Sequence, residues 1–156
     1  NLLLPIDEII EIRDILPTLV ELGTGETENG TDGKSFAALM DTGNERLDHQ
    51  KKSEKVKIHD FLHGEHEMGE YSTQFILTKE WKYIWYSQTG EEQLFNLKKD
   101  PDERKDLINE KEYSEIIQEL RRYLIESLNG REEEYVENGR LVIGKHPKPT
   151  LNCLKK

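Results

Sequence analysis

Four short apolar segments, separated by links of a few residues, constrain the fold of this chain most strongly. They begin near Val56, Tyr71, Trp81 and Gln93. Parallel strands need long crossover connections, so links this short favour strands that pair antiparallel with their sequence neighbours. The sequence therefore predicts a four-stranded antiparallel meander over residues 56–62, 71–77, 81–86 and 93–97, with Gly90 taking a positive φ in the last turn.

An amphipathic helix is predicted after the last strand. Its apolar residues recur at intervals of three and four: Tyr113, Ile116, Ile117, Leu120, Leu124 and Leu128. Asn109 and Glu112 have the spacing of a capping box, and Asn129-Gly130 is typical of a helix end. We expect the apolar face to cover one face of the meander, which gives an α+β fold. Residues 140–143 are expected to add an edge strand.

The first 55 residues are predicted to hold a short helix and loops. Leu16, Leu19 and Leu22 have helical spacing, so we expect a helix over residues 15–22, with Asp14 at its N-cap and Gly23 at its end. One or two further helical turns are expected over residues 35–40, capped by Ser35. Residues 41–54 are polar and have no apolar period.

Composition indicates a domain with a thin core that normally packs against another body. Hydrophobic residues make up 34% of the chain and charged residues 35%. The apolar surface of residues 6–40 is expected to be partly exposed and to favour self-association. The net charge of −10 argues against nucleic acid and anionic membranes as partners, since both require a basic surface.

The chain has no apolar run of about 20 residues, so it predicts a soluble protein without a membrane span. The opening Asn1-Leu2-Leu3-Leu4-Pro5 lacks the basic region of a signal peptide, and it has the character of a chain cut from a longer one. The compartment is not specified. A single cysteine, Cys153, excludes an internal disulfide.

The segment His63-Gly64-Glu65-His66 is the best candidate for chemistry. A zinc site is disfavoured, because on a strand His63 and Glu65 point to one face while Gly64 and His66 point to the other. A substrate-pocket rim is favoured, where histidine and glutamate hydrogen-bond a hydroxyl group, or charged histidine a sulfate oxygen. A purely structural role remains an equal alternative for His63 and Glu65, and the better one for His66.

Several motifs in sequence order resemble the C-terminal portion of arylsulfatase-type sulfatases. The first two are Asp14-Ile15-Leu16-Pro17-Thr18-Leu19 and Asp32-Gly33-Lys34-Ser35-Phe36. The others are the 63–66 segment, Lys82-Tyr83-Ile84-Trp85-Tyr86, and the run from Gly90 to Glu103. The resemblance implies a bacterial enzyme of the alkaline-phosphatase-like superfamily. It assigns residues 1–55 to the end of a large α/β domain, 56–130 to a C-terminal subdomain and 131–156 to an extended charged tail.

The resemblance also implies that the parent enzyme hydrolyses sulfate monoesters. Such enzymes use a formylglycine, made in a Cys/Ser-x-Pro-x-Arg motif, and a calcium ion that polarises the sulfate. The motif does not occur in this chain, so we expect the chain alone to be inactive and to hold no cofactor. The N-terminal catalytic domain is the implied partner, a sulfate ester the implied substrate, and His63, Glu65 and His66 the implied pocket rim.

Two alternatives remain open at this point. Related phosphonate or phosphodiester hydrolases share the architecture implied by the resemblance. A stand-alone binding or dimerisation module without an attached enzyme is the other.

Overall fold

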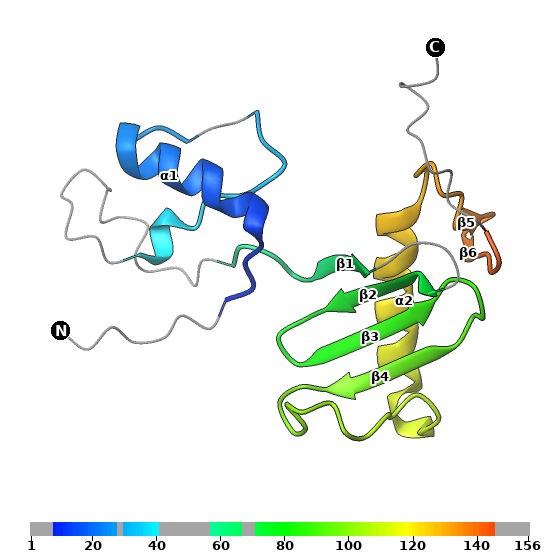
Figure 1. Ribbon diagram of the computed structural model, residues 1–156. Coiled ribbons are helices and arrows are strands. Elements are labelled where there is room, and N and C mark those ends of the chain that lie inside the picture. Colours follow the sequence, from blue (N-terminus) through cyan, green and yellow to red (C-terminus); the bar gives the residue numbers. More distant parts are fainter. Residues whose placement is uncertain (1–7, 28–29, 41–56, 67–70, 146–156) are drawn as a thin grey trace, which may run out of the picture. The chain divides into compact units, whose positions relative to one another are not determined.

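The computed structural model describes residues 8–27, 30–40, 57–66 and 71–145 (Figure 1). The chain divides into two compact units, Asn1–Leu62 and His63–Lys156. Residues 41–54, as well as Cys153, lie outside the described residues. No helix in the described part of the chain is long and apolar enough to cross a membrane.

The second unit is built on a four-stranded sheet. Its strands are β1 (Leu62–His66), β2 (Thr73–Leu77), β3 (Trp81–Tyr86) and β4 (Glu92–Asn96), in the spatial order β1-β2-β3-β4. The β2–β3 and β3–β4 pairs are antiparallel, so the predicted meander is confirmed, but its first strand lies at residues 62–66 and not at the expected 56–62. Gly90, in the link between β3 and β4, has φ 77°, as expected for this turn.

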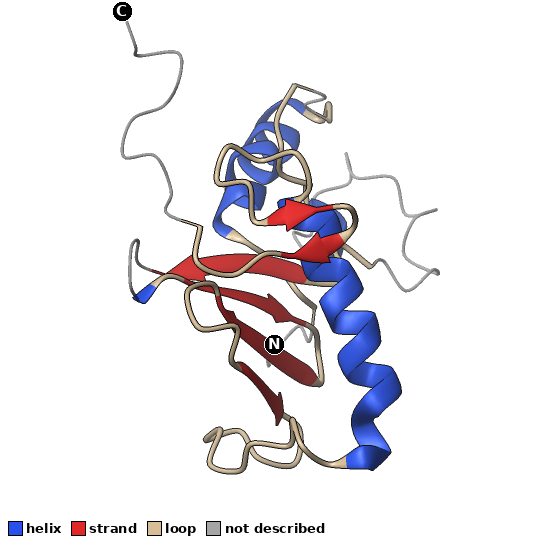
Figure 2. Cartoon of the chain, turned by 90° about the vertical axis from the view of Figure 1, so that its right-hand side faces the viewer, coloured by secondary structure: helices blue, strands red, loops and turns tan. Residues whose placement is uncertain are grey.

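One face of this sheet is covered by a long helix, α2 (Ser114–Leu128) (Figures 1 and 2). The buried residues of α2 are Ile117, Leu120, Leu124 and Leu128. The apolar residues buried on the sheet are Ile76, Tyr83, Trp85, Leu94 and Phe95. The predicted α+β packing is confirmed, and burying this apolar surface is the main contribution to the stability of the unit.

The predicted capping box at the start of α2 is wrong. A 3-10 helix, Lys111–Tyr113, precedes α2, and neither segment has a side-chain cap. The spacing of Asn109 and Glu112 fits a capping box only if the α-helix begins directly after Asn109. Here the chain makes a tighter turn first, which shifts the α-helix to Ser114.

A small hairpin follows α2 and replaces the edge strand expected over residues 140–143. Strand β5 (Val136–Glu137) pairs with β6 (Arg140–Leu141) in a separate two-stranded sheet. Asn138 and Gly139 form its turn with φ values of 51° and 72°, the combination that a tight hairpin needs. Asn-Gly is a strong hairpin signal, and it explains why residue 140 pairs locally with residue 137.

The residue before this hairpin, Tyr135, belongs to the core. Its exposed fraction is 2%, and its ring meets that of Trp85 nearly edge-on, at 83° and with centroids 5.7 Å apart. The Tyr135 hydroxyl lies 3.1 Å from the Ser72 hydroxyl, so its polar atom is also satisfied. The core therefore includes a residue from the charged segment after α2.

The first unit contains helix α1 (Ile15–Thr24), preceded by the 3-10 helix Ile12–Asp14 and followed by the 3-10 helix Ala37–Leu39. The expected helix is confirmed, but its end is two residues later than predicted. Gly25, with φ 79°, forms the C-cap, and its N–H donates to the Glu21 carbonyl. Gly23 lies inside the helix. The expected turn after Ser35 is also confirmed, and the Ser35 hydroxyl accepts from the Ala37 N–H.

Candidate functional site

The segment His63–His66 forms most of strand β1, and its side chains alternate between the two faces of the sheet. His63 is half-buried, and its Nε2 lies 2.8 Å from Oε1 of Gln74 on strand β2. Gly64 faces the other side, where a Cβ atom would lie 2.1 Å from the Phe75 ring. This arrangement confirms the expected separation of His63 and Glu65 from Gly64 and His66.

Glu65 takes part in an ion cluster that reaches beyond the sheet. Its carboxylate accepts hydrogen bonds of 3.0 and 3.3 Å from Nη2 of Arg131, three residues after α2. The same Arg131 nitrogen donates to Glu133 at 2.7 Å. Arg131 therefore bridges two carboxylates, and the three side chains together carry one negative charge.

Burial is the main cause that holds the pKa of His63 below its ordinary value, against the carboxylates of Glu65 and Glu133, which raise that pKa. The hydrogen bond with Gln74 also opposes this lowering, and the positive charge of Arg131 adds to it. Burial opposes ionisation of Glu133, but the hydrogen bond from Arg131 prevails and lowers the pKa of Glu133. A neutral ring is thus placed next to a charged cluster.

His66 does not join His63 and Glu65. Its side chain is exposed, and strand alternation places it on the Gly64 face. Its carbonyl oxygen accepts a 3.3 Å hydrogen bond from the Thr73 hydroxyl. The structure therefore brings together two of the three residues expected at the pocket rim.

Sequence reasoning missed Gln74, Arg131 and Glu133 as members of this cluster. Gln74 had a usable signal, because it alternates with Ile76 on strand β2 and so occupies an inward position. Its exposed fraction is 2%. Arg131 had none, since it lies in a charged segment 66 positions from Glu65, and Glu133 joins the cluster only through Arg131.

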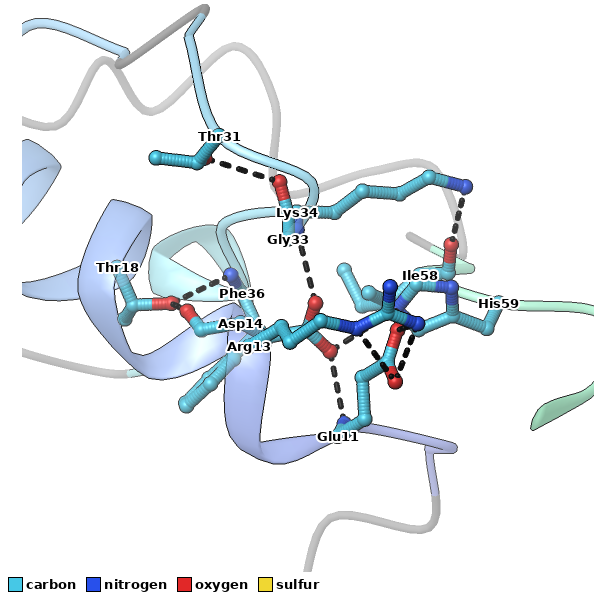
Figure 3. A network of polar contacts seen from close by, with 10 residues as sticks. All are labelled: Glu11, Arg13, Asp14, Thr18, Thr31, Gly33, Lys34, Phe36, Ile58 and His59. Carbon is cyan, nitrogen blue, oxygen red and sulfur yellow. Dashed lines mark hydrogen bonds and ion pairs between the residues drawn. The ribbon is translucent and has the colours of Figure 1, made fainter. Parts of the chain in front are cut away.

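A second polar network lies in the first unit, around Asp14 (Figure 3). The fully buried Asp14 carboxylate accepts from the N–H groups of Glu11 and Lys34, both at 2.8 Å. His59 Nε2 lies 2.9 Å from Asp14 Oδ2. Asp14 is the N-cap residue of α1, as expected, but its side chain makes no cap hydrogen bond to the helix, because its oxygens bind other segments.

Glu11, Asp14 and His59 have oxygen or nitrogen atoms within 4.8 Å of one another, an arrangement that could hold a cation. The four carboxylate oxygens of Asp14 and Glu11 already accept hydrogen bonds. Asp14 accepts two backbone N–H groups, and Glu11 is held by Arg13 through hydrogen bonds of 2.8 to 3.1 Å. Calcium requires six or more oxygen ligands, and this set offers few that are not engaged. The residues do not fit the calcium ion that the resemblance implies.

An open polar groove borders strand β4, and it includes the carboxylates of Glu91, Glu92 and Asp106. Glu92 accepts from Arg121 and from the Tyr83 hydroxyl. Asp106 accepts the N–H groups of Leu94 and Ile108. These contacts join α2 and the 106–108 loop to the sheet, which accounts for two of the three carboxylates as structural groups.

Comparison with protein families now identifies the fold. The family model described as N-sulphoglucosamine sulphohydrolase, C-terminal, matches residues 4–130. The chain belongs to this sulfatase family. The match includes helix α1, the sheet and helix α2, and it confirms the resemblance drawn from the sequence motifs.

Individual bacterial sulfatases are similar over nearly the whole chain. An arylsulfatase of Clostridium perfringens is 40% identical over 149 residues, which are 96% of this chain and 28% of that protein. A Delta 4,5-hexuronate-2-O-sulfatase of Bacteroides thetaiotaomicron is 29% identical over 133 residues, 84% of this chain and 26% of that protein. The sulfatase chain thus spans about a quarter of the length of these curated relatives.

Solved structures show the same fold. A 2-O GAG sulfatase superposes with a TM-score of 0.66 and 25% identity, over 94% of this chain and 33% of that one. A protein solved in complex with its substrate D-glucosamine-2-N,6-O-disulfate superposes with a TM-score of 0.58 and 17% identity, over 74% of this chain and 23% of that one. At that identity the second comparison supports the fold alone.

Proposed function

We propose that this chain is the C-terminal portion of an enzyme that hydrolyses sulfate monoesters, such as aryl sulfates or related compounds. The observation that carries the proposal is the 40% identity to an arylsulfatase over 96% of the chain. The relatives are about four times longer, so in this proposal the reaction centre lies in a preceding catalytic domain.

The nucleophile and the metal would come from that catalytic domain. This chain has no Cys/Ser-x-Pro-x-Arg motif, and the cluster of Glu11, Asp14 and His59 is internally hydrogen-bonded. Formylglycine and calcium therefore belong to the proposed whole enzyme. The chain by itself is proposed to be inactive.

The catalytic domain is also the proposed partner of helix α1. Three of the apolar side chains of this unit are largely exposed: Ile12 by 83%, Leu16 by 58% and Leu19 by 61%. An amphipathic helix normally buries its apolar stripe against another layer. In the proposal, residues 1–55 complete the large α/β domain, residues 56–130 form the C-terminal subdomain, and residues 131–156 follow as a charged segment.

His63, Glu65 and His66 are proposed to border the substrate pocket of the whole enzyme. The support is the concentration of His63, Glu65, Gln74, Arg131 and Glu133 at one end of strand β1. Hydrogen-bonding groups held in fixed positions orient a substrate without taking part in bond cleavage. His66, on the opposite face, is the member of this set with the least structural support.

The test is an activity assay on the full-length protein that carries this chain, with calcium present. Release of sulfate from 4-nitrophenyl sulfate or from a sulfated sugar is expected from the full-length protein and not from residues 1–156 alone. Assays with a phosphate diester and a phosphonate monoester run in parallel. Faster hydrolysis of either phosphorus ester would replace the sulfatase assignment, and activity of the isolated chain would refute its dependence on a separate catalytic domain.

A further inference from the structure

The tautomer of His63 is fixed by its neighbour Gln74. The Nε2 atom lies 2.8 Å from Gln74 Oε1, an amide oxygen that only accepts hydrogen bonds. Gln74 is 2% exposed and packed beneath α2, so its amide is held in place by the core. The ring proton must therefore be on Nε2, which leaves Nδ1 with a lone pair.

The second ring nitrogen is available to a ligand. Within the described residues, Nδ1 of His63 has no hydrogen-bond partner, and the His63 side chain is only partly buried. A neutral imidazole with Nε2–H can only accept a hydrogen bond at Nδ1. The group that binds there must then be a donor, such as a hydroxyl.

The charges around His63 disfavour a sulfate group at this position. Arg131 is bound to the carboxylates of Glu65 and Glu133, at 3.0 and 2.7 Å. The two carboxylates carry two negative charges against the one positive charge of Arg131, so the surroundings of His63 have a net negative charge. A sulfate oxygen has no proton to donate to Nδ1, and it would be repelled by the carboxylates.

We infer that His63 accepts a hydrogen bond at Nδ1 from a hydroxyl of the substrate, outside the sulfate group, and that Gln74 is the positioning residue that sets its tautomer. The inference rests on the proposed function, because a substrate reaches His63 only if strand β1 borders the pocket. It selects between the two roles expected from the sequence, which were contact with a hydroxyl and contact with a sulfate oxygen. His63 is assigned to the hydroxyl.

Nitrogen-15 NMR of the 156-residue chain, labelled at its histidines, tests the tautomer of His63 directly. A pyrrole-type Nε2 and a pyridine-type Nδ1 are expected for His63 at pH 7. The conversion of Gln74 to glutamate, Gln74→Glu, is expected to raise the pKa of His63, because a carboxylate stabilises the charged ring. The opposite tautomer, or a ring charged at pH 7, would overturn the inference whether or not the whole protein is a sulfatase.

Steady-state kinetics of the full-length protein test the role in binding. For a monosaccharide sulfate with free hydroxyl groups, His63→Ala is expected to raise KM by about threefold to tenfold, the loss typical of one neutral hydrogen bond. The kcat is expected to change less than KM. For 4-nitrophenyl sulfate, which has no hydroxyl, and for inhibition by inorganic sulfate, changes under twofold are expected.

Two further variants separate binding from folding. His63→Asn keeps an acceptor close to the Nδ1 position and should recover most of the affinity, whereas His63→Lys offers only donors and should not. Arg122→Gln on the exposed side of α2 is the control and should leave the kinetics unchanged.

Equal losses of affinity for both substrates, or weaker inhibition by sulfate, would overturn the inference. Hydrolysis of 4-nitrophenyl sulfate without hydrolysis of any sugar sulfate would also overturn it but would leave the proposed function standing, and hydrolysis of neither would refute the proposed function.

Discussion

His59 lies 2.9 Å from Asp14 although 45 positions separate them in the sequence. The same buried carboxylate accepts the backbone N–H of Lys34, 20 positions away. Asp14 therefore holds three distant segments of the first unit at one point. Sequence motifs that look unrelated, Asp14 to Leu19 and Asp32 to Phe36, are joined by this carboxylate.

Asp14→Ala is expected to destabilise the first unit by about 3 kcal/mol, because two backbone N–H donors and His59 lose the buried carboxylate that binds them. The measurement is urea unfolding followed by circular dichroism. Asp102→Ala is the matched control, since the Asp102 side chain is 67% exposed and should matter by no more than about 0.5 kcal/mol. Equal stability of the two variants would show that Asp14 does not link these segments.

The Asp14 carboxylate also predicts a dependence of stability on pH. Burial opposes its ionisation, but the hydrogen bonds from Lys34, Glu11 and His59 prevail and lower its pKa below the ordinary value. A carboxylate whose pKa is lowered by folding contributes its full stabilisation at pH values above its unfolded-state pKa of about 4. This contribution is lost as the pH falls through its folded-state pKa. Unfolding experiments between pH 7 and pH 2 should show the loss in the wild type and a smaller one in Asp14→Asn. Parallel curves for the two proteins would contradict this.

Gly64→Ala is expected to destabilise the second unit by about 1 to 3 kcal/mol, because the new Cβ would lie 2.1 Å from the ring of Phe75. The cause is steric, so shortening the neighbour should relieve it. Thermal unfolding of Gly64→Ala, Phe75→Leu and the double variant measures the coupling. If the two single effects simply add, the contact with Phe75 is not what excludes a side chain at position 64.

Arg131→Gln is expected to raise the pKa of His63, since Arg131 contributes to its lowering and the carboxylates of Glu65 and Glu133 would remain. The change in stability should stay within about 1 kcal/mol, because the ion pairs are partly exposed. An NMR titration of the His63 ring gives the pKa. Arg122→Gln is the control and should leave the titration curve of His63 unchanged. If Arg131→Gln also leaves the curve unchanged, Arg131 does not affect the pKa of His63 and is not part of the site.

Self-association of the 156-residue chain follows from the exposed residues of the first unit. Sedimentation velocity should show concentration-dependent dimers or larger species, and the double variant Leu16→Glu/Leu19→Glu should reduce them. The control Tyr71→Glu changes a side chain of the second unit that is 72% exposed, and it should not reduce self-association. A strict monomer that binds no hydrophobic dye would contradict the prediction.

The sheet and α2 could be predicted from sequence because each depends on a local pattern that tertiary contacts reinforce. Trp81 to Tyr86 has strand spacing with short links on both sides, and Leu120, Leu124 and Leu128 define a helical stripe. Element ends were less predictable, because Gly23 and Gly25 are equally good helix terminators and only the structure distinguishes them. Strand β1 begins at Leu62, later than the apolar pattern from Val56 suggested.

The candidate site was predictable only in part. His63 and Glu65 stood out because their residue types and alternation are visible in the sequence. Arg131 was not predictable, because its contact with Glu65 spans 66 positions and depends on where α2 ends. The tautomer of His63 depends on Gln74, and such a pairing appears only when β1 and β2 are placed side by side.

The coding sequence upstream of the Asn1 codon tests the central claim most directly. If this chain is the C-terminal portion of a sulfatase, the open reading frame should continue upstream and contain a Cys/Ser-x-Pro-x-Arg motif a few hundred residues before Asn1. A start codon immediately before Asn1, with no such motif in frame, would contradict the account and leave a module that works without its own catalytic domain.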